Sequence, residues 1–99
     1  MKAVQVRGEI LESLSLSELC SFCRADEDWV VELVSYGVLE PEGTARQEWQ
    51  FRGVNIVRAK KARRLYSDLG INVAGVAMVL DLLQERERIL HRLSMVEED

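Results

Sequence analysis

The chain has 99 residues, of which 47% are hydrophobic and 30% are charged, and it contains one proline and six glycines. This length and composition predict one globular domain with a single hydrophobic core, and they exclude a disordered chain. The sequence has no run of about 18 apolar residues, so no membrane-spanning helix is expected. Its first residues become charged too soon for a secretory signal, which makes a cytoplasmic protein the expectation.

The net charge of −4 is unevenly distributed along the chain. Residues 1–51 carry four basic and ten acidic side chains, a net charge of −6, whereas residues 52–99 carry nine basic and seven acidic ones, a net charge of +2. Between Arg52 and Tyr66, six side chains are basic and none is acidic. The sequence therefore predicts an acidic first half and a basic middle segment, and this asymmetry bears on the choice of partner more than the total charge does.

The start of the sequence predicts an extended arm followed by a short helix. Residues 3–14 alternate loosely between apolar and polar side chains, which is typical of an edge strand or an arm. Ser15, with Glu18 three residues later, fits a capping box in which the two residues satisfy backbone N–H groups at the start of a helix. We therefore expect a first helix at about residues 17–23.

A second helix is expected directly afterwards. Asp26 is a good N-cap, because its carboxylate can accept a hydrogen bond from a backbone N–H of the first turn. Gly37 fits the left-handed position that ends a helix. The apolar residues of this segment share one inner face: Trp29, Val30, Leu33 and Val34. Two short helices joined by a tight turn at residues 24–26 predict a helix-turn-helix.

A wing and a third helix are expected next. The chain extends at residues 38–39, turns at Pro41 and Gly43, and extends back at residues 49–51, which predicts a small β-hairpin. The third helix should run from about residue 54 to residue 69 and end before a glycine. Its basic side chains should lie mostly outside.

A fourth helix should run from a cap at Asn72 to about Met95. At 1.5 Å per residue it would be roughly 35 Å long, more than a small core can cover. One interpretation is an amphipathic core helix whose charge run at residues 84–88 is solvated. We favour the other, in which the protruding half packs on a second copy, because apolar residues continue beyond the reach of the core. The predicted seam of this homodimer is formed by Leu83, Leu90 and Leu93.

Together these elements predict a single domain of the mainly α class. Residues 1–14 would form the arm, residues 15–70 a winged helix-turn-helix with a small β-hairpin wing, and residues 71–99 a long C-terminal helix.

The two cysteines, Cys20 and Cys23, have the C-x-x-C spacing. A redox role would need a thioredoxin-like strand and helix around them, and a zinc site would need two further ligands, whereas His91 is the only histidine. On a helix the two cysteines share a face with Leu16 and Leu19, so we expect buried small hydrophobic residues. His91 lies among charged residues and is expected to be solvated. No cofactor or metal is predicted.

The sequence offers little to an enzyme, because no phosphate loop, nucleophile elbow or paired catalytic side chains are apparent. The second helix carries four carboxylates: Asp26, Glu27, Asp28 and Glu32. A cation site is one interpretation, but three consecutive acidic residues fan out around a first helical turn, where they are ordinary partners of the helix dipole. A non-enzymatic protein is expected.

DNA binding is the main competing function. The architecture suits it, and Arg58, Lys61 and Arg64 could contact a phosphate backbone. The recognition helix of such a protein must however present hydrogen-bond donors to base edges in the major groove. Here the corresponding helix presents carboxylates, which phosphates repel. Direct DNA binding is therefore not the expectation, although a DNA-binding regulator stays the alternative.

An ordered set of short motifs runs through the chain: Glu18-Leu19-Cys20, Gly37-Val38-Leu39-Glu40-Pro41, Trp49-x-Phe51, Arg58-Ala59, Leu65, Asp68-Leu69, Ile71-Asn72 and Gly75-Val76-Ala77. In order and spacing this set resembles the family of chaperone modulatory proteins CbpM, which look like truncated members of the MerR-type winged helix-turn-helix group. The most specific parts of the resemblance are the segments 37–41 and 49–51. The resemblance covers about residues 10–95, and residues 1–9 lie outside it and have no assigned role.

The resemblance implies an adaptor that binds the J-domain of a CbpA-type, DnaJ-like co-chaperone. Proteins of this family inhibit the co-chaperone by occluding the J-domain surface that a DnaK-type chaperone uses. That surface is a basic helix, so an inhibitor should present carboxylates to it. We therefore expect the partner contact at Asp26, Glu27, Asp28 and Glu32. The alternatives are an acidic solvated face without a partner and a MerR-like transcription regulator.

Overall fold

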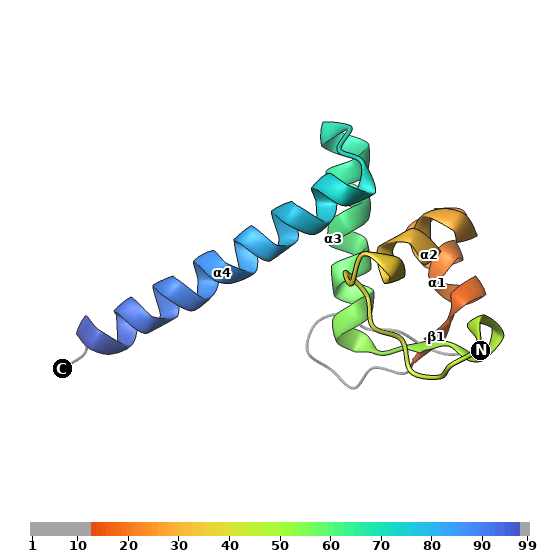
Figure 1. Ribbon diagram of the computed structural model, residues 1–99, viewed down its shortest axis with the longest axis horizontal. Coiled ribbons are helices and arrows are strands. Elements are labelled where there is room, and N and C mark those ends of the chain that lie inside the picture. The colour runs from red at the N-terminus through yellow and green to blue at the C-terminus, as the bar shows by residue number, and fades with distance from the viewer. Residues whose placement is uncertain (1–12, 98–99) are drawn as a thin grey trace.

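The computed structural model describes residues 13–97 of the chain. Figure 1 shows a helical head and one long helix that leaves it. In chain order the elements are β1 (Leu14–Ser15), α1 (Leu16–Cys23), α2 (Glu27–Ser35), the 3-10 helix η1 (Arg46–Glu48), β2 (Gln50–Phe51), α3 (Gly53–Leu69) and α4 (Val73–Glu97). The predicted class, mainly α with a long C-terminal helix, is confirmed. Residues 1–12 of the predicted N-terminal arm lie outside the described residues.

Polar caps begin three of the helices, as predicted. At α1, the Ser15 hydroxyl accepts a hydrogen bond from the Glu18 N–H at 3.2 Å, and the Glu18 carboxylate accepts one from the Ser15 N–H at 2.8 Å. At α2, the Asp26 carboxylate accepts a hydrogen bond from the Trp29 N–H at 3.0 Å. Before α4, the Asn72 side-chain oxygen accepts a bond from the N–H of residue 75 at 2.9 Å. Each cap satisfies a donor that the helix leaves unpaired.

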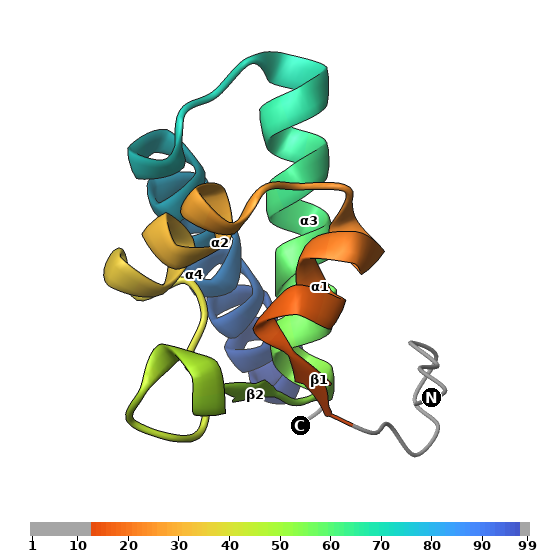
Figure 2. The same cartoon turned by 90° about the vertical axis from the view of Figure 1, so that its right-hand side faces the viewer.

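The core lies where α1, α2, α3 and the first turns of α4 meet (Figure 2). The inward face predicted for α2 is largely confirmed, since Trp29, Val30 and Leu33 are buried, while Val34 is half-buried. The largest fully buried side chains are Phe51, Leu19, Leu33, Leu39, Ile56, Val30 and Val76. These residues come from every helix of the head and from β2, so the described helix-turn-helix folds as one packed unit.

The wing is narrower than the sequence indicates. β2 pairs antiparallel with β1, so that Leu14 lies opposite Phe51 and Ser15 opposite Gln50. The predicted hairpin is closed by a single bridge between Glu42 and Gln50, whose backbone groups exchange hydrogen bonds of 2.9 and 3.0 Å. The antiparallel partner of β2 is therefore mainly the segment before α1.

A side chain explains why residues 38–41 do not form a strand. Val38 and Leu39 are buried in the core. The Asn55 side chain pairs with the backbone of Glu40: its amide N–H donates to the Glu40 carbonyl at 3.1 Å, and its amide oxygen accepts from the Glu40 N–H at 2.9 Å. The amide of Asn55 thus takes the backbone groups of Glu40 that a neighbouring strand would use.

α3 and α4 meet at a sharp elbow, with a bend of 119° between them. α4 packs on α2 and α3 through its first turns, and Val73, Val76 and Leu80 are buried there. From residue 81 to residue 96 every side chain is exposed. We call this segment the distal arm; at 1.5 Å per residue it extends about 24 Å from the head. By length and composition no single described helix could span a membrane, and only the bent α3–α4 pair taken together meets that test.

Candidate functional site

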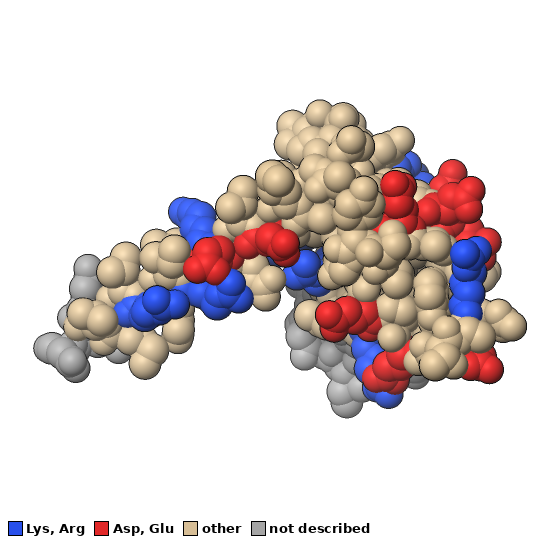
Figure 3. All heavy atoms as spheres, viewed as in Figure 1, with Lys and Arg blue, Asp and Glu red and all other residues tan. Residues whose placement is uncertain are grey.

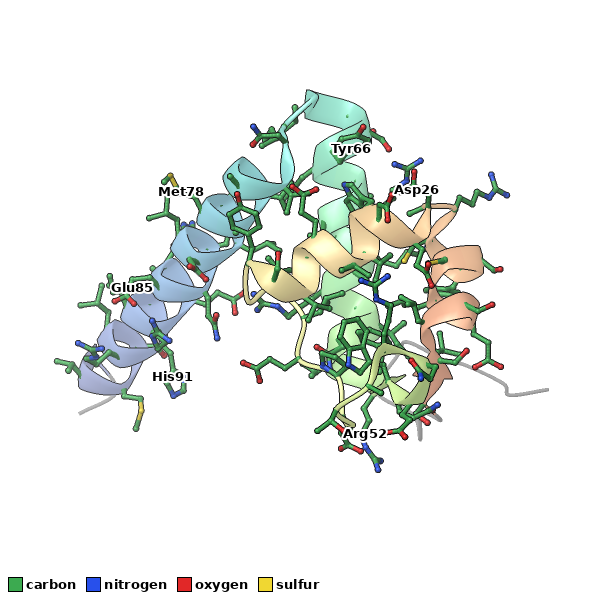
Figure 4. All side chains as sticks on the ribbon, turned by 45° about the vertical axis from the view of Figure 1, so that its right-hand side comes forward. Asp26, Arg52, Tyr66, Met78, Glu85 and His91 are labelled. Atoms are coloured by element: carbon green, nitrogen blue, oxygen red, sulfur yellow. The ribbon has the colours of Figure 1, made fainter. Side chains whose placement is uncertain are left out.

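The four carboxylates predicted as a partner surface are all exposed, and acidic side chains gather over the α1 and α2 side of the head (Figure 3). They do not form a single cluster. Asp28 and Glu32 are one turn apart and therefore share a face of α2, whereas Glu27 is turned by about 100° from Asp28. Glu27 instead lines a groove of about 430 Å³ beside Arg46 and the start of α1. Asp26 lies at the N-terminal end of α2 and serves as its cap (Figure 4).

Both cysteines lie on α1. Burial raises the pKa of the Cys20 thiol, and the nearby Glu27 and Asp26 carboxylates raise it further. Burial raises the pKa of Cys23 to about 11, against an opposing effect of Lys60. Both cysteines are free, Cys23 buried and Cys20 half-buried, and both pack in the core. Between residues 13 and 97, no three His, Cys, Asp or Glu side chains are grouped so as to hold a metal ion.

Most basic side chains at the start and middle of α3 are engaged within the head. The Arg52 guanidinium forms an ion pair with Glu42 at 2.8 Å, and the Arg58 Nε donates to the Val38 carbonyl at 2.9 Å. Lys60 lies over the ring of Phe22, at 5.1 Å from its centroid. These contacts place the basic groups against aromatic rings and backbone oxygens of neighbouring elements.

Arg63 takes part in an aromatic cluster that the sequence analysis missed. Its guanidinium lies 5.9 Å from the ring of Trp29 and 5.5 Å from the ring of Tyr66, and these two rings are 5.7 Å apart. The Trp29 indole N–H is buried without a hydrogen-bond partner among the described residues. No spacing rule in the sequence signals this cluster, because it joins α2 to α3 across 37 residues.

Lys61 and Arg64 lie elsewhere. Both are exposed, and they stand at the edge of a groove of about 300 Å³ at the elbow between α3 and α4. No ion pair or hydrogen bond of either side chain is found in the described part of the chain. The three residues considered for DNA binding are therefore divided, since Arg58 is half-buried on a backbone carbonyl while Lys61 and Arg64 face the groove beside α4.

The predicted seam residues lie on the distal arm, where Figure 4 marks Glu85 and His91. Leu83, Leu90 and Leu93 are 47%, 46% and 53% exposed. Leu82 and Ile89 are also exposed, so the apolar face of the distal arm includes more residues than the three predicted for the seam. Their positions follow from the 100° turn per residue, so this part could have been found from the sequence.

Comparisons with known proteins place the chain in a family. Residues 14–98 match the model of the MerR HTH family regulatory protein. The chain is 36% identical over 95 residues to the chaperone modulatory protein CbpM of Coxiella burnetii (strain Dugway 5J108-111), and the match covers 93% of this chain and 90% of that relative. Identity is 33% over 89 residues to the proteins of the same name from Pseudomonas entomophila (strain L48) and Pseudomonas putida (strain W619), with coverage of 90% and 88% in each case. The chain therefore belongs to the chaperone modulatory protein CbpM family, within the MerR-type helix-turn-helix group.

Proposed function

We propose that this protein is a non-enzymatic adaptor that binds the J-domain of a CbpA-type co-chaperone and inhibits its stimulation of a DnaK-type chaperone. Membership of the CbpM family, whose members are named chaperone modulatory proteins, supports a role in a chaperone system. The observation that carries the proposal is the exposed acidic face of α2. Asp28 and Glu32 point to solvent on the second helix of the helix-turn-helix, without an ion pair to any described residue.

The chemistry of this face fits a basic helix. A J-domain presents such a helix to a DnaK-type chaperone, so two carboxylates one turn apart offer it charges of the opposite sign. Glu27 and Asp26 extend the negative potential toward α1. An adaptor that occupies the basic helix would exclude the chaperone from the J-domain.

The second candidate is a DNA-binding regulator, which the match to the MerR HTH family favours. Such a protein would place α2 in the major groove, where Asp28 and Glu32 would face the phosphates. It would also rely on basic side chains of α3, yet Arg58 is held by the Val38 carbonyl and Arg63 by aromatic rings. Both contacts hold the guanidinium groups against the head, away from a phosphate backbone, whereas Lys61 and Arg64 stay exposed.

The test reverses the two exposed carboxylates. The double variant Asp28→Lys/Glu32→Lys is compared with the wild type for binding to the J-domain and to duplex DNA at two salt concentrations. Asp81 and Glu85 supply a matched control, because they have the same one-turn spacing on the exposed part of α4. The control Asp81→Lys/Glu85→Lys changes the net charge equally but leaves α2 intact.

We expect the α2 variant to bind the J-domain at least ~10-fold more weakly, equivalent to about 1.4 kcal/mol, and the control to bind as the wild type does. The loss should appear mainly in the association rate and should shrink at high salt. Nonspecific DNA binding should increase in both variants. Wild-type protein that ignores the J-domain and binds a specific duplex, with binding lost in Lys61→Glu/Arg64→Glu, would establish the regulator instead.

A further inference from the structure

Tyr36 is an exposed aromatic residue at the end of the acidic face of α2. It follows Glu32 by four residues and Asp28 by eight, so each side chain of the series is turned by only about 40° from the one before. Tyr36 is 51% exposed, and both carboxylates are exposed as well. At 1.5 Å per residue the three side chains span about 12 Å along the helix. An aromatic ring therefore lies within the surface proposed for the J-domain.

The backbone on both sides of Tyr36 is held by a hydrogen-bonded helix end. Gly37 takes the left-handed conformation, with a φ of +78°, and its N–H donates to the Val34 carbonyl at 3.0 Å. The N–H of the next residue, the buried Val38, donates to the Leu33 carbonyl at 2.9 Å. This pair of bonds is the Schellman motif, which fixes the last turn of α2. Binding through Tyr36 therefore restricts only the two side-chain torsions of the ring.

The ring of Tyr36 differs from other aromatic rings of the head in its surroundings. Three of those rings have a cationic group of the same chain at 5.1 to 5.9 Å from the ring centroid; they are Phe22, Trp29 and Tyr66. Among residues 13–97, the ring of Tyr36 has neither a cation nor a second ring beside it. The face of an aromatic ring attracts cations because it carries partial negative charge. Tyr36 therefore presents to solvent a ring face that suits a cation of another molecule.

We propose that the ring of Tyr36 binds a lysine or arginine side chain of the basic helix of the J-domain, one helical turn beyond the cation that meets Glu32. This inference rests on the adaptor function proposed above and adds a third contact to the same surface. Charge complementarity supports it, because the carboxylates of Asp28 and Glu32 attract a helix that carries several cations. The ring then attracts a further cation of that helix through its negative face.

The ring and the carboxylates contribute to different rate constants. The charges of Asp28 and Glu32 act over a distance, so they raise the association rate and are screened by salt. The ring of Tyr36 contacts its cation only after the two proteins have docked, so it lowers the dissociation rate. Water is largely excluded between a ring and the cation stacked on it, and salt screens such a contact much less. Tyr36 therefore determines how long the complex lasts.

The experiment compares two variants of Tyr36 in the full chain, with the J-domain of a CbpA-type co-chaperone as the probe. Tyr36→Leu keeps an apolar side chain but removes the ring, so it should dissociate roughly 5- to 30-fold faster at low and at high salt, with an unchanged association rate. Tyr36→Phe is the matched control, because it keeps the ring, and it should dissociate within ~3-fold of the wild-type rate. Circular dichroism verifies that both variants keep the helical fold.

The cation is identified by replacing each lysine and arginine of the basic helix of the J-domain with leucine, one at a time. The effect of Tyr36→Leu on dissociation should disappear with one of these J-domain variants and persist with the others. If Tyr36→Leu dissociates at the wild-type rate, or if its effect persists with every J-domain variant, the ring binds no cation and the inference is wrong. The adaptor function still stands in that case, provided that Asp28→Lys/Glu32→Lys weakens binding. Wild-type protein that does not bind the J-domain would overturn both proposals.

Discussion

The first turns and the distal arm of α4 both carry large apolar residues, but these residues have different surroundings. Val73, Val76 and Leu80 in the first turns are buried, whereas Leu83, Leu90 and the other apolar residues of the distal arm are exposed. The difference arises at the elbow, because α3 turns away by 119° and leaves the later turns without a neighbour. Apolar periodicity therefore predicts which face of a helix is apolar, but it does not predict whether a neighbouring element of the chain covers that face.

The largest contrast is expected between a core residue of the head and an exposed residue of the distal arm. Phe51 is fully buried where β2 meets the helices, so Phe51→Ala should lower the free energy of unfolding by about 3–5 kcal/mol. Leu90→Ala, measured at a protein concentration where copies are separate, should change it by less than ~0.5 kcal/mol. Urea denaturation followed by circular dichroism compares the two. A large decrease in the free energy of unfolding of Leu90→Ala under those conditions would mean that the distal arm packs against its own chain.

A smaller effect is expected at the polar contact that replaces a strand. Asn55→Ala would leave the N–H and the carbonyl of Glu40 without their partner, at a cost of about 1–3 kcal/mol in unfolding free energy. Gln84→Ala on the distal arm is the matched amide deletion and should be close to neutral. Equal stability of the two variants in urea would show that solvent replaces the Asn55 amide without loss.

Two carboxylates of the α2 segment are expected to differ in their contribution to stability, because Asp26 caps the helix and Glu32 is exposed. Asp26→Ala removes the hydrogen bond to the Trp29 N–H and should cost about 1 kcal/mol. Glu32→Ala on the same helix removes an exposed carboxylate and should stay within ~0.5 kcal/mol. Thermal unfolding at neutral pH provides the comparison. If both variants unfold at the wild-type temperature, the cap contributes nothing measurable.

The smallest perturbation uses thiol chemistry. With its pKa raised to about 11, Cys23 is almost entirely protonated at pH 8 and should alkylate far more slowly than a cysteine placed on the arm, such as Ile89→Cys. The native state holds this proton more tightly than the unfolded state, whose thiol pKa is about 9. Its contribution to stability is therefore complete below pH 9 and is lost as the pH rises toward 11. Mass spectrometry after timed alkylation measures the labelling of each thiol. Equal labelling of Cys23 and of the cysteine introduced by Ile89→Cys would contradict the prediction.

The local elements could be predicted from the sequence because their signals are local. Ser15 with Glu18, Asp26 and Asn72 each cap a helix through residues at most three positions away. The strand partner of β2 could not be predicted in this way. It depends on Asn55, which holds Glu40 from 15 residues away and prevents residues 38–41 from pairing.

The candidate site also combines features that local sequence spacing predicts with features that depend on contacts between distant residues. The exposure of Asp28 and Glu32 follows from helical spacing, so the sequence indicates it correctly. The surroundings of the basic side chains do not follow from helical spacing. Arg58 donates to the Val38 carbonyl and Arg63 lies over the Trp29 ring, and both contacts join elements far apart in the chain. The run of basic residues thus predicts one phosphate-binding surface, whereas the fold holds Arg58 and Arg63 against the head and leaves Lys61 and Arg64 exposed at the elbow groove.

α4 extends far from the elbow, so a small change of angle there moves the far end of the helix over a long distance. The helix has 25 residues, which at 1.5 Å each give a length of about 37 Å. A tilt of about 10° at residues 70–72 would therefore displace its far end by roughly 6 Å. The position of the far end of α4 relative to the acidic face of α2 is therefore set by this short connection. A substitution at residues 70–72 would thus change that position without altering either surface.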